Sequence, residues 1–306
     1  MTRSPIRFDG RVAIVTGAGG GLGRSHALAL AQRGATVVVN DLGGTVAGVV
    51  SGDAPGPTAA QRVVDEITAA GGRALASTHD IATPDGARAL ADAALGAFGR
   101  IDVLVNNAGI LRDKSFARMP PADFEAVIRV HLLGSAWCTQ AVWPAMQAQQ
   151  YGRVVMTTSA AGLYGNFGQA NYGAAKMGLV GLMTTLKEEG SRHGIRVNTI
   201  APVALTRMTE SVALGGMLAG ATPEKVTAGV LFLASEACPE SGCILSAGAG
   251  YFSLVRVVEG QGLHAQDDQV TPEFVAQAWP QLAQMAGARG FANATEALGA
   301  IFGPQR

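Results

Sequence analysis

The sequence predicts an α/β protein built on a doubly wound, parallel β-sheet. Short runs of β-branched and apolar residues alternate with longer stretches of helical spacing, which is typical of parallel sheets with helices on both faces. The first run leads directly into a glycine-rich segment, 17–23, and a helical stretch follows it. With 306 residues, of which 48% are hydrophobic, the chain is long enough for one such sheet and its helices.

About seven strands are expected, at residues 11–16, 35–40, 73–79, 101–106, 153–158, 195–200 and 243–247. Helices are expected in the intervals between them. The longest begins at Pro120 and Pro121, because proline is favoured in the first turn of a helix, and runs toward Met146. The segment 43–57 is rich in glycine and proline and is expected to be a loop.

The composition argues against several classes of function. Basic and acidic residues balance at 23 each, so nothing indicates binding to nucleic acid. The five histidines are scattered and the three cysteines are irregularly spaced, so neither a metal site nor a disulfide framework is expected. The first ten residues lack the apolar core of a signal peptide, and no apolar run reaches membrane-spanning length. We therefore expect a cytoplasmic protein.

Residues 11–41 have the pattern of a nucleotide-binding βαβ unit. A strand runs into Gly17–Gly23, a helical stretch ends at Gly34, and a second strand leads to Asp41. Glycines let the backbone approach a pyrophosphate, and the helix N-terminus attracts its charge. A carboxylate at Asp41 would accept hydrogen bonds from the adenosine ribose and repel a 2′-phosphate, which favours NAD over NADP. The alternative is that Asp41 is a solvated residue of a turn.

A second pattern joins Ser159 to Tyr172 and Lys176. The four-residue step between the tyrosine and the lysine places both on one face of a helix. There an ammonium group can lower the pKa of the phenol, which could then exchange a proton with a carbonyl or alcohol near neutral pH. Ser159 follows the apolar run 153–158, and its hydroxyl could bind the same substrate oxygen. The alternative is an amphipathic helix with a half-buried tyrosine and a lysine that extends to solvent.

Together these motifs resemble the short-chain dehydrogenase/reductase family over nearly the whole chain. Residues 16–23 resemble its spaced-glycine motif, 106–109 its Asn-Asn-Ala-Gly motif, and Ser159, Tyr172 and Lys176 its catalytic residues. The resemblance implies a Rossmann fold and the NAD-dependent interconversion of a secondary alcohol and a ketone, with Tyr172 as acid/base. It implies cofactor contacts from Gly17, Gly21, Leu22, Gly23, Asp41, Asp80, Ile81, Asn107, Gly109, Tyr172, Lys176, Pro202, Val203 and Thr206.

Two positions depart from the family's usual pattern. His131 stands where the family commonly has an asparagine that helps to hold a water in the proton path. The histidine could hold the same water as a fourth catalytic residue, or it could pack and bond to a backbone carbonyl. Val203 stands where a glycine often follows the proline. Asp80, which the resemblance places beside the adenine, could instead be the N-cap of a turn. Residues 203–222 are the expected substrate lid.

Five segments resemble one branch of the family, the (3R)-3-hydroxyacyl-CoA dehydrogenase unit of peroxisomal multifunctional enzymes of type 2. They are residues 40–44, 109–113, 115–118, 129–131 and 164–172. The branch implies a 3-hydroxyacyl-CoA substrate, NAD, and a histidine at the position of His131. The alternatives are a hydroxysteroid dehydrogenase of the 17-beta type, and a sensor that binds NAD(H) without turnover.

The resemblance also implies the organisation of the chain. Residues 1–250 are expected to form the NAD-binding catalytic domain, and residues 251–306 an extension packed on that domain or on a partner subunit. A homodimer or homotetramer is expected. The expected partners are a small-molecule substrate, either an acyl-CoA or a steroid-like alcohol, with no nucleic acid and no membrane.

Overall fold

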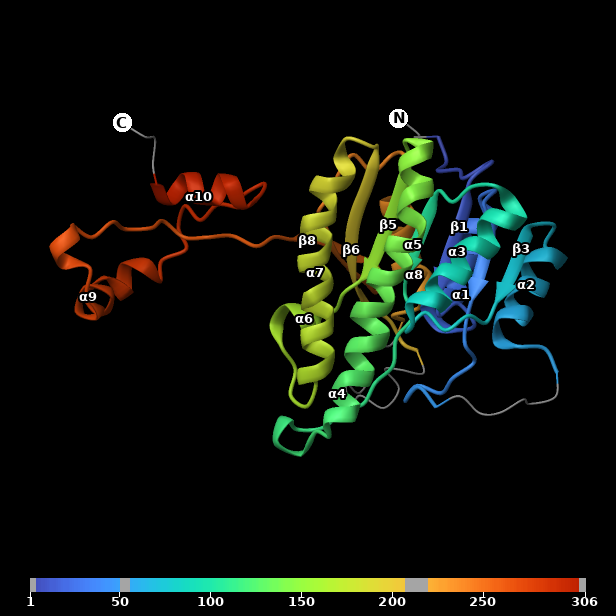
Figure 1. Cartoon of the computed structure of the whole chain (residues 1–306), viewed down its shortest axis with the longest axis horizontal. Coiled ribbons are helices and arrows are strands. Elements are labelled where there is room, and N and C mark those ends of the chain that lie inside the picture. The colour runs from blue at the N-terminus through green and yellow to red at the C-terminus, as the bar shows by residue number, and fades with distance from the viewer. Residues whose placement is uncertain (1–3, 50–55, 207–219, 303–306) are drawn as a thin grey trace. The chain divides into compact units, whose positions relative to one another are not determined.

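The structure is a computed structural model that describes residues 4–49, 56–206 and 220–302 (Figure 1). The chain divides into two compact units, Met1–Leu254 and Val255–Arg306. The first unit contains the sheet and its flanking helices.

An eight-stranded sheet forms the centre of the first unit, in the order β3-β2-β1-β4-β5-β6-β7-β8. Its strands are β1 (Val12–Thr16), β2 (Thr36–Asn40), β3 (Arg73–Ser77), β4 (Val103–Asn106), β5 (Gly152–Thr157), β6 (Ile195–Val203), β7 (Ile244–Gly248) and β8 (Tyr251–Val255). Neighbouring strands from β1 to β7 pair in parallel. The predicted α/β fold is therefore confirmed. The strand order reverses between β1 and β4, where open α/β sheets bind ligands.

The eighth strand, β8, is absent from the predicted set. It neighbours β7 in the sheet, and only Ala249 and Gly250 separate the two strands. Both residues have positive φ angles, 51° and 90°, as the tight turns of β-hairpins require. A two-residue connection joins antiparallel strands only, so the chain reverses here at the edge of the sheet.

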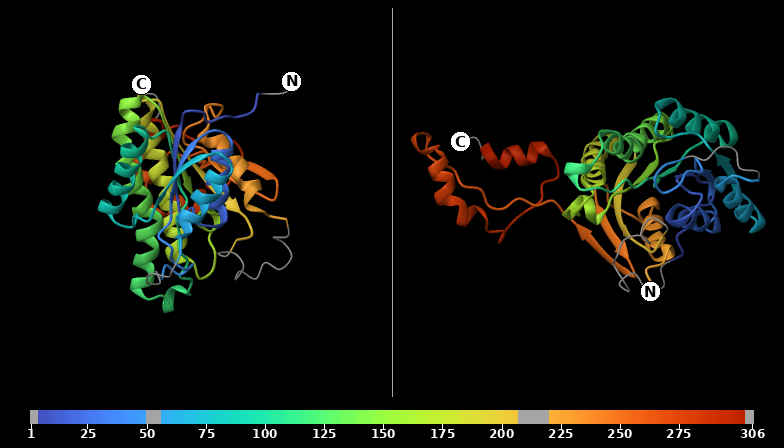
Figure 2. Two further views of the ribbon diagram at one scale, coloured as in Figure 1. Left: turned by 90° about the vertical axis from the view of Figure 1, so that its right-hand side faces the viewer. Right: turned by 90° about the horizontal axis from the view of Figure 1, so that it is seen from below.

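Helices cover both faces of the sheet (Figure 2). They are α1 (Gly21–Gln32), α2 (Ala59–Ala69), α3 (Pro84–Phe98), α4 (Pro121–Ile128), α5 (Gly134–Gln149), α6 (Ala160–Tyr164), α7 (Ala170–Ser191) and α8 (Pro223–Ala234). Helix α1 contacts α2 and α8 on one face, while α5 contacts α3 and α7 on the other. The largest group of buried apolar side chains joins the sheet to α1 and α8, through residues such as Leu30, Val39 and Val230.

The long helix predicted from Pro121 to Met146 contains a π-helical turn, η2 (Arg129–Leu133), between α4 and α5. Two side-chain interactions lie at the π-helical turn. The ring of His131 is bonded to the backbone of Ile110, and the hydroxyl of Ser135 donates to the carbonyl of His131 at 2.6 Å. Such turns are rare and frequently mark functional sites. Sequence periodicity does not reveal this turn, because its flanks are ordinary α-helix.

The second unit is small. It contains a 3-10 turn, η4 (Asp267–Gln269), and two helices, α9 (Pro272–Leu282) and α10 (Ala294–Phe302). Reciprocal backbone hydrogen bonds between Glu259 and Arg289 close it. No side chain is buried in its described part, residues 255–302. Across the described ranges of the whole chain, no helix has the length and apolar content to cross a membrane.

Asp102 anchors the start of the two central strands. Its buried carboxylate accepts hydrogen bonds from the backbone N–H of Val12 at 2.9 Å, from Arg11 at 2.9 Å and from Arg100 at 2.6 and 2.7 Å. Burial by itself raises the pKa of this carboxyl group. The hydrogen bonds from Arg100, Val12 and Arg11 outweigh it and hold the pKa below its usual value.

Replacing Asp102 by alanine is expected to lower the free energy of unfolding by about 2 kcal/mol, since it leaves the buried N–H of Val12 without its acceptor. Because the folded-state pKa is depressed, the stabilisation is present above the unfolded-state pKa and is lost as the pH falls through the folded-state value. Urea titrations of wild type and variant at pH 7 and in acid measure both effects. The exposed pair of Arg7 and Asp9 provides the control, Asp9→Ala. An equal loss in both variants contradicts the assignment.

Candidate active site

Tyr172 and Lys176 lie one turn apart near the start of α7. The Nζ atom of Lys176 is 5.4 Å from the centroid of the Tyr172 ring. Two bonds hold this part of the helix: the hydroxyl of Thr158 donates to the carbonyl of Lys176 at 2.7 Å, and the N–H of Tyr172 donates to the side-chain oxygen of Asn171 at 2.7 Å. The structure therefore brings the two predicted side chains together on one helix face.

Lys176 is an almost fully buried cation. Its side chain is 3% exposed, and Nζ donates to the carbonyl of Thr157, at the end of β5, at 2.5 Å. Removal from water disfavours the charged form, and burial lowers the pKa of Lys176 to about 7. In the protein without ligand, this lysine is therefore only partly protonated at neutral pH.

Ser159 caps α6 and also bonds to Tyr172. Its Oγ accepts from the N–H of Ala161 at 3.2 Å, so its own hydrogen is available to the tyrosine oxygen. Burial raises the pKa of Tyr172; the hydrogen bond from Ser159 lowers it, and the charge of Asp113 raises it further. Lys176 is not among the groups that shift this pKa, so the expected depression of the Tyr172 pKa by the lysine is not observed, and desolvation of the phenol is the largest effect.

His131 packs edge-on against Tyr172, with ring centroids 5.1 Å apart and planes at 87°. Its Nε2 lies 2.8 Å from the carbonyl of Ile110 and 3.0 Å from the N–H of the same residue. Gly109 makes room for the ring, because a Cβ there would lie 2.2 Å from the histidine Cε1. Of the two roles expected for His131, backbone bonding is observed, and holding a water stays a prediction.

The electrostatics of His131 follow from its position. Burial, together with the charge of Lys176, lowers the pKa of His131 well below its usual value, so the ring is neutral at pH 7. Within the described part of the chain its Nδ1 has no hydrogen-bond partner, and neither has Oγ1 of Thr157.

The glycine segment is fixed against the end of β4. Asn107 Nδ2 donates to the carbonyls of Thr16 and Gly17 at 2.9 and 3.1 Å, and the Thr16 hydroxyl accepts from the N–H groups of Asn107 and Ala108. Gly17 has a φ of +63°, and a Cβ there would lie 2.6 Å from the Ala108 backbone. Only glycine allows this close approach. Asn107 thus clamps the loop as well as lining the site.

Asp41 is held at the end of β2 by two backbone groups. Its carboxylate accepts from the N–H of Gly19 at 2.8 Å and from the N–H of Gly43 at 2.8 Å. A Cβ at Gly19 would lie 2.7 Å from this carboxylate. The acid is therefore fixed beside the glycine segment, as a ribose-binding carboxylate would need to be.

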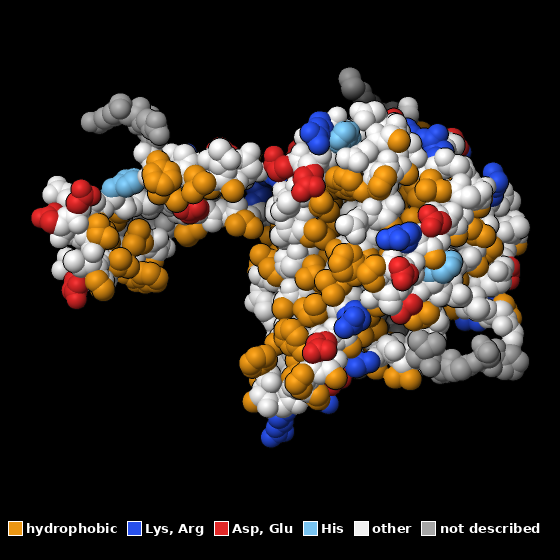
Figure 3. Space-filling model, viewed as in Figure 1, with side chains coloured by type: hydrophobic (Ala, Val, Ile, Leu, Met, Phe, Trp, Pro, Cys, Tyr) orange, Lys and Arg blue, Asp and Glu red, His pale blue; other side chains and the backbone are white. Residues whose placement is uncertain are grey.

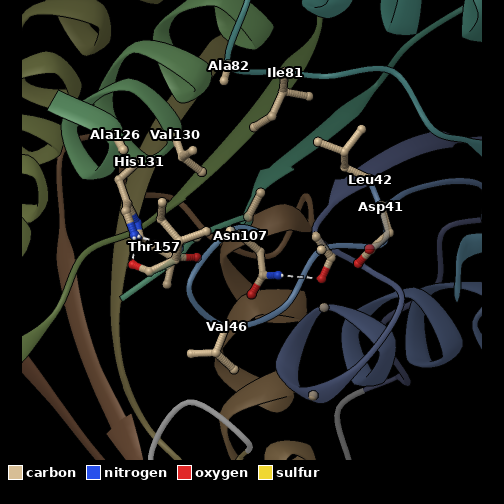
Figure 4. A pocket seen from close by; sticks show the side chains of 18 of the residues that line it. Asp41, Leu42, Val46, Ile81, Ala82, Asn107, Ala126, Val130, His131 and Thr157 are labelled. Carbon is tan, nitrogen blue, oxygen red and sulfur yellow. Dashed lines mark hydrogen bonds between the residues drawn. The ribbon is translucent and has the colours of Figure 1, made fainter. Parts of the chain in front are cut away.

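A cavity of about 590 Å³ joins these groups. In Figure 4, Asp41 and Leu42 lie at one end of it, and His131 and Thr157 lie at the other. His131 and all but one of the predicted cofactor residues line it: Gly17, Gly21, Leu22, Gly23, Asp41, Asp80, Ile81, Asn107, Gly109, Tyr172, Lys176, Pro202 and Thr206. Ser159 borders Tyr172 without lining the cavity.

Val203 is the exception. Its side chain is 41% exposed and does not line the cavity, because successive residues of strand β6 point to opposite sides and Pro202 faces inward. Most of the predicted lid, residues 207–219, lies outside the described residues. Sequence reasoning missed several lining residues. Leu42, Ala108 and Ile110 directly follow predicted site residues, Thr157 ends β5, and Val46 lies in the loop after β2.

These residues fit a dinucleotide. A glycine cradle that side chains would fill, a helix N-terminus behind it and a fixed carboxylate beside it match the pyrophosphate and ribose of such a cofactor. Among the described residues, no group of three His, Cys, Asp or Glu side chains could hold a metal ion.

Comparison with known proteins agrees with this geometry. A family model described as short chain dehydrogenase matches residues 11–214. Peroxisomal multifunctional enzyme type 2 of Mus musculus is 47% identical over 97% of this chain and 40% of its own length. A hydroxyacyl-CoA dehydrogenase of Mycobacterium tuberculosis is 40% identical over 78% of this chain and 77% of its own.

Solved structures show the same relationship. Full-length peroxisomal multifunctional enzyme type 2 from Drosophila melanogaster superposes with a TM-score of 0.81 and 39% identity, over 97% of this chain and 49% of that one. A 7α-hydroxysteroid dehydrogenase complexed with NADH and 7-oxo glycochenodeoxycholic acid gives a TM-score of 0.70 and 35% identity, over 80% of this chain and 95% of that one. The chain spans less than half the length of the type 2 multifunctional enzymes that it matches.

The fold and the site together define an oxidoreductase that acts on CH–OH groups with a nicotinamide dinucleotide. The chain belongs to the short-chain dehydrogenase/reductase family. Within the family it is similar, over nearly all its length, to the hydroxyacyl-CoA dehydrogenase unit of the type 2 multifunctional enzymes.

The pH dependence of the free energy of unfolding should reveal the titration of the buried Lys176. Because the folded-state pKa of Lys176 is lowered to about 7, the unfolded chain binds a proton between pH 7 and 10 that the folded chain does not. The free energy of unfolding of the protein without ligand should therefore rise across this window, by roughly 4 kcal/mol at about 1.36 kcal/mol per unit. Lys176→Met should lack this rise, and the exposed-lysine variant Lys225→Met should keep it. Parallel profiles for wild type and Lys176→Met contradict the burial of a titrating lysine.

Proposed function

We propose that the chain interconverts (3R)-3-hydroxyacyl-CoA and 3-oxoacyl-CoA with NAD, and that Tyr172 is the acid/base. The observation that carries the proposal is the placement of Tyr172, bonded to Ser159 and beside Lys176, in the same cavity as the glycine cradle. The acyl-CoA substrate is supported by similarity to a hydroxyacyl-CoA dehydrogenase and to the multifunctional enzymes of type 2.

The choice of NAD over NADP rests on Asp41. A carboxylate fixed by Gly19 and Gly43 offers acceptors to a ribose diol and repels a 2′-phosphate. Similarity to a hydroxysteroid dehydrogenase that carries NADH also supports NAD.

The chemistry follows from the residues. Ser159 and Tyr172 would hydrogen-bond the substrate hydroxyl, and Tyr172 as phenolate would take its proton. Bound NAD would supply the acceptor for the hydride. Lys176 would hold the nicotinamide ribose and, once protonated, stabilise the phenolate. Negative charge develops on the substrate oxygen in the transition state, so these fixed donors supply most of the rate acceleration.

His131 would serve in proton transfer through a bound water. Its Nδ1 and the Thr157 hydroxyl are buried polar groups that line the cavity and have no partner in the described ranges. Buried water commonly bridges such groups. A proton could then pass between Lys176, the water and the histidine.

A hydroxysteroid is the second candidate substrate. The observation that favours it is the structural match to 7α-hydroxysteroid dehydrogenase across 80% of this chain. The same residues would perform the same chemistry on a bulky secondary alcohol. A sensor that binds NAD(H) without turnover has less support, because Ser159, Tyr172 and Lys176 are all present and adjacent.

We also assign the chain to a homodimer or homotetramer. Figure 3 shows hydrophobic side chains spread over the face on which α4 and α7 lie, with lysines and arginines between them. Apolar surface of this kind favours association. Residues 251–306 would pack on the catalytic domain or on a partner subunit, since no side chain is buried within residues 255–302. The cytoplasmic location stays a prediction.

Replacing Tyr172 by phenylalanine should keep dinucleotide affinity and lower the turnover rate by roughly 10² to 10⁴, the usual contribution of general acid–base catalysis. Tyr251→Phe is the matched control, because Tyr251 is a 65% exposed tyrosine on β8. Fluorescence titration with NADH and steady-state kinetics give the two quantities. Turnover within a few-fold of wild type removes Tyr172 from the role.

The substrate is tested by a panel. Reduction of NAD and of NADP is followed with (3R)-hydroxyacyl-CoA esters of increasing chain length, their (3S) epimers and a hydroxysteroid. We expect the highest kcat/KM with a (3R) ester and NAD. A higher value for the steroid establishes the second candidate, and tight NADH binding without turnover of any alcohol establishes the sensor.

A further inference from the structure

Asn171 occupies an unusual position directly before the tyrosine. Its side chain is fully buried, with 0% exposure, and does not line the cavity. Its Nδ2 donates to the carbonyls of Arg112 and Asp123 at 3.1 and 3.4 Å, and its Oδ1 accepts from the N–H of Tyr172. Because the N-cap residue of α7, Gln169, makes no side-chain capping bond, Asn171 supplies an acceptor that the first turn of a helix needs. One amide thus ties the start of the catalytic helix to two distant segments.

Arg112 connects the same junction to the cofactor end of the cavity. Its Nε donates to the carbonyl of Ala47 at 3.0 Å, and its guanidinium pairs with the carboxylate of Asp123 at 3.2 Å. Next to it, the N–H of Leu111 donates to the carbonyl of Val46 at 2.9 Å. Residues 42–49, which follow Asp41, are therefore fastened to residues 111 and 112.

Residues 42–49 form one wall of the cavity. Leu42, Thr45 and Val46 line it, and Figure 4 shows Leu42 and Val46 on its border. Backbone and side-chain bonds from Thr45 to Gly48 and Val49 close the segment into a turn. A molecule bound beside Asp41 would hold this wall in place.

We infer that Arg112, Asp123 and Asn171 form a latch that couples the wall at residues 42–49 to the position of Tyr172. In this inference, which rests on the proposed role of Tyr172, Asn171 is a positioning residue. Arg112 lines the cavity itself, and its part in the latch is to connect the wall to Asp123 and to the junction with α7. A dinucleotide that orders the wall also holds Tyr172 in its reactive position. Coupling of this kind is reciprocal, so a change at Asn171 must weaken dinucleotide binding although Asn171 does not line the cavity.

The test is a double-mutant cycle on the full chain. Asn171→Asp keeps the size of the side chain but replaces the donating amide nitrogen by a carboxylate oxygen, which cannot donate to the carbonyls of Arg112 and Asp123. Arg112→Met keeps the length of the stem and removes the donors. NADH affinity is measured by fluorescence, and hydride transfer is measured in single turnovers at saturating NADH with a 3-oxoacyl-CoA, over a range of pH.

We expect Asn171→Asp and Arg112→Met each to weaken NADH binding about tenfold and each to slow hydride transfer at saturating NADH about tenfold, the effect of losing one hydrogen bond. The double variant should show about the loss of one single variant, because both break the same connection. The pH midpoint of hydride transfer should also move. A mere loss of folded protein lowers the rate equally at every pH and leaves the midpoint and the NADH affinity unchanged.

The matched control is Arg118→Met, which removes an arginine from the same stretch of chain outside the latch. Wild-type NADH affinity in Asn171→Asp, or losses that multiply in the double variant, overturns the latch. If Asn171→Asp does not fold, the test rests on Arg112→Met. Hydride transfer at the wild-type rate in Arg112→Met at saturating NADH then overturns the inference. Tyr172→Phe separates the two proposals: normal turnover there rejects the role of Tyr172, whereas the NADH affinities of the latch variants are measured without any turnover.

Discussion

The burial of an ammonium group beside a phenol is the constraint on which the active site depends. Lys176 is removed from water, with the Thr157 carbonyl as its hydrogen-bond acceptor, and the half-buried Tyr172 lies beside it. Burial lowers the pKa of the lysine and raises that of the tyrosine, so it favours the neutral form of both. Forming the phenolate and the ammonium group therefore requires a stabilisation that burial does not supply.

The segment after β4 brings the parts of this site together. Asn107 clamps the glycine loop, Gly109 and Ile110 accommodate His131, and Arg112 reaches both the cavity wall and the junction with α7. The π-turn carries His131, whose ring is bonded to the backbone of Ile110 in this segment. Six consecutive residues thus connect cofactor contact, ring placement and helix placement.

Local spacing was sufficient to predict much of this. The alternation of strands and helices, the glycines beside Asp41, and the four-residue step from Tyr172 to Lys176 each depend on neighbours in the sequence. The bond from Asn171 to Arg112 spans 59 residues and has no local signal, and neither has the π-turn. The sign of the Tyr172 pKa shift was predicted wrongly because spacing shows a nearby cation but not the loss of water. The strand β8 was missed because its turn is formed by Ala249, which rarely adopts a positive φ.

The most direct measurement is the ionisation of Tyr172 itself. The absorbance of tyrosinate is followed against pH in wild type, with Tyr172→Phe subtracted, for the protein alone and saturated with NAD. The account predicts that Tyr172 ionises above the ordinary range of a phenol in the protein alone and at a clearly lower pH in the complex. Ionisation at the same pH in both states, or below the ordinary range without ligand, would contradict it.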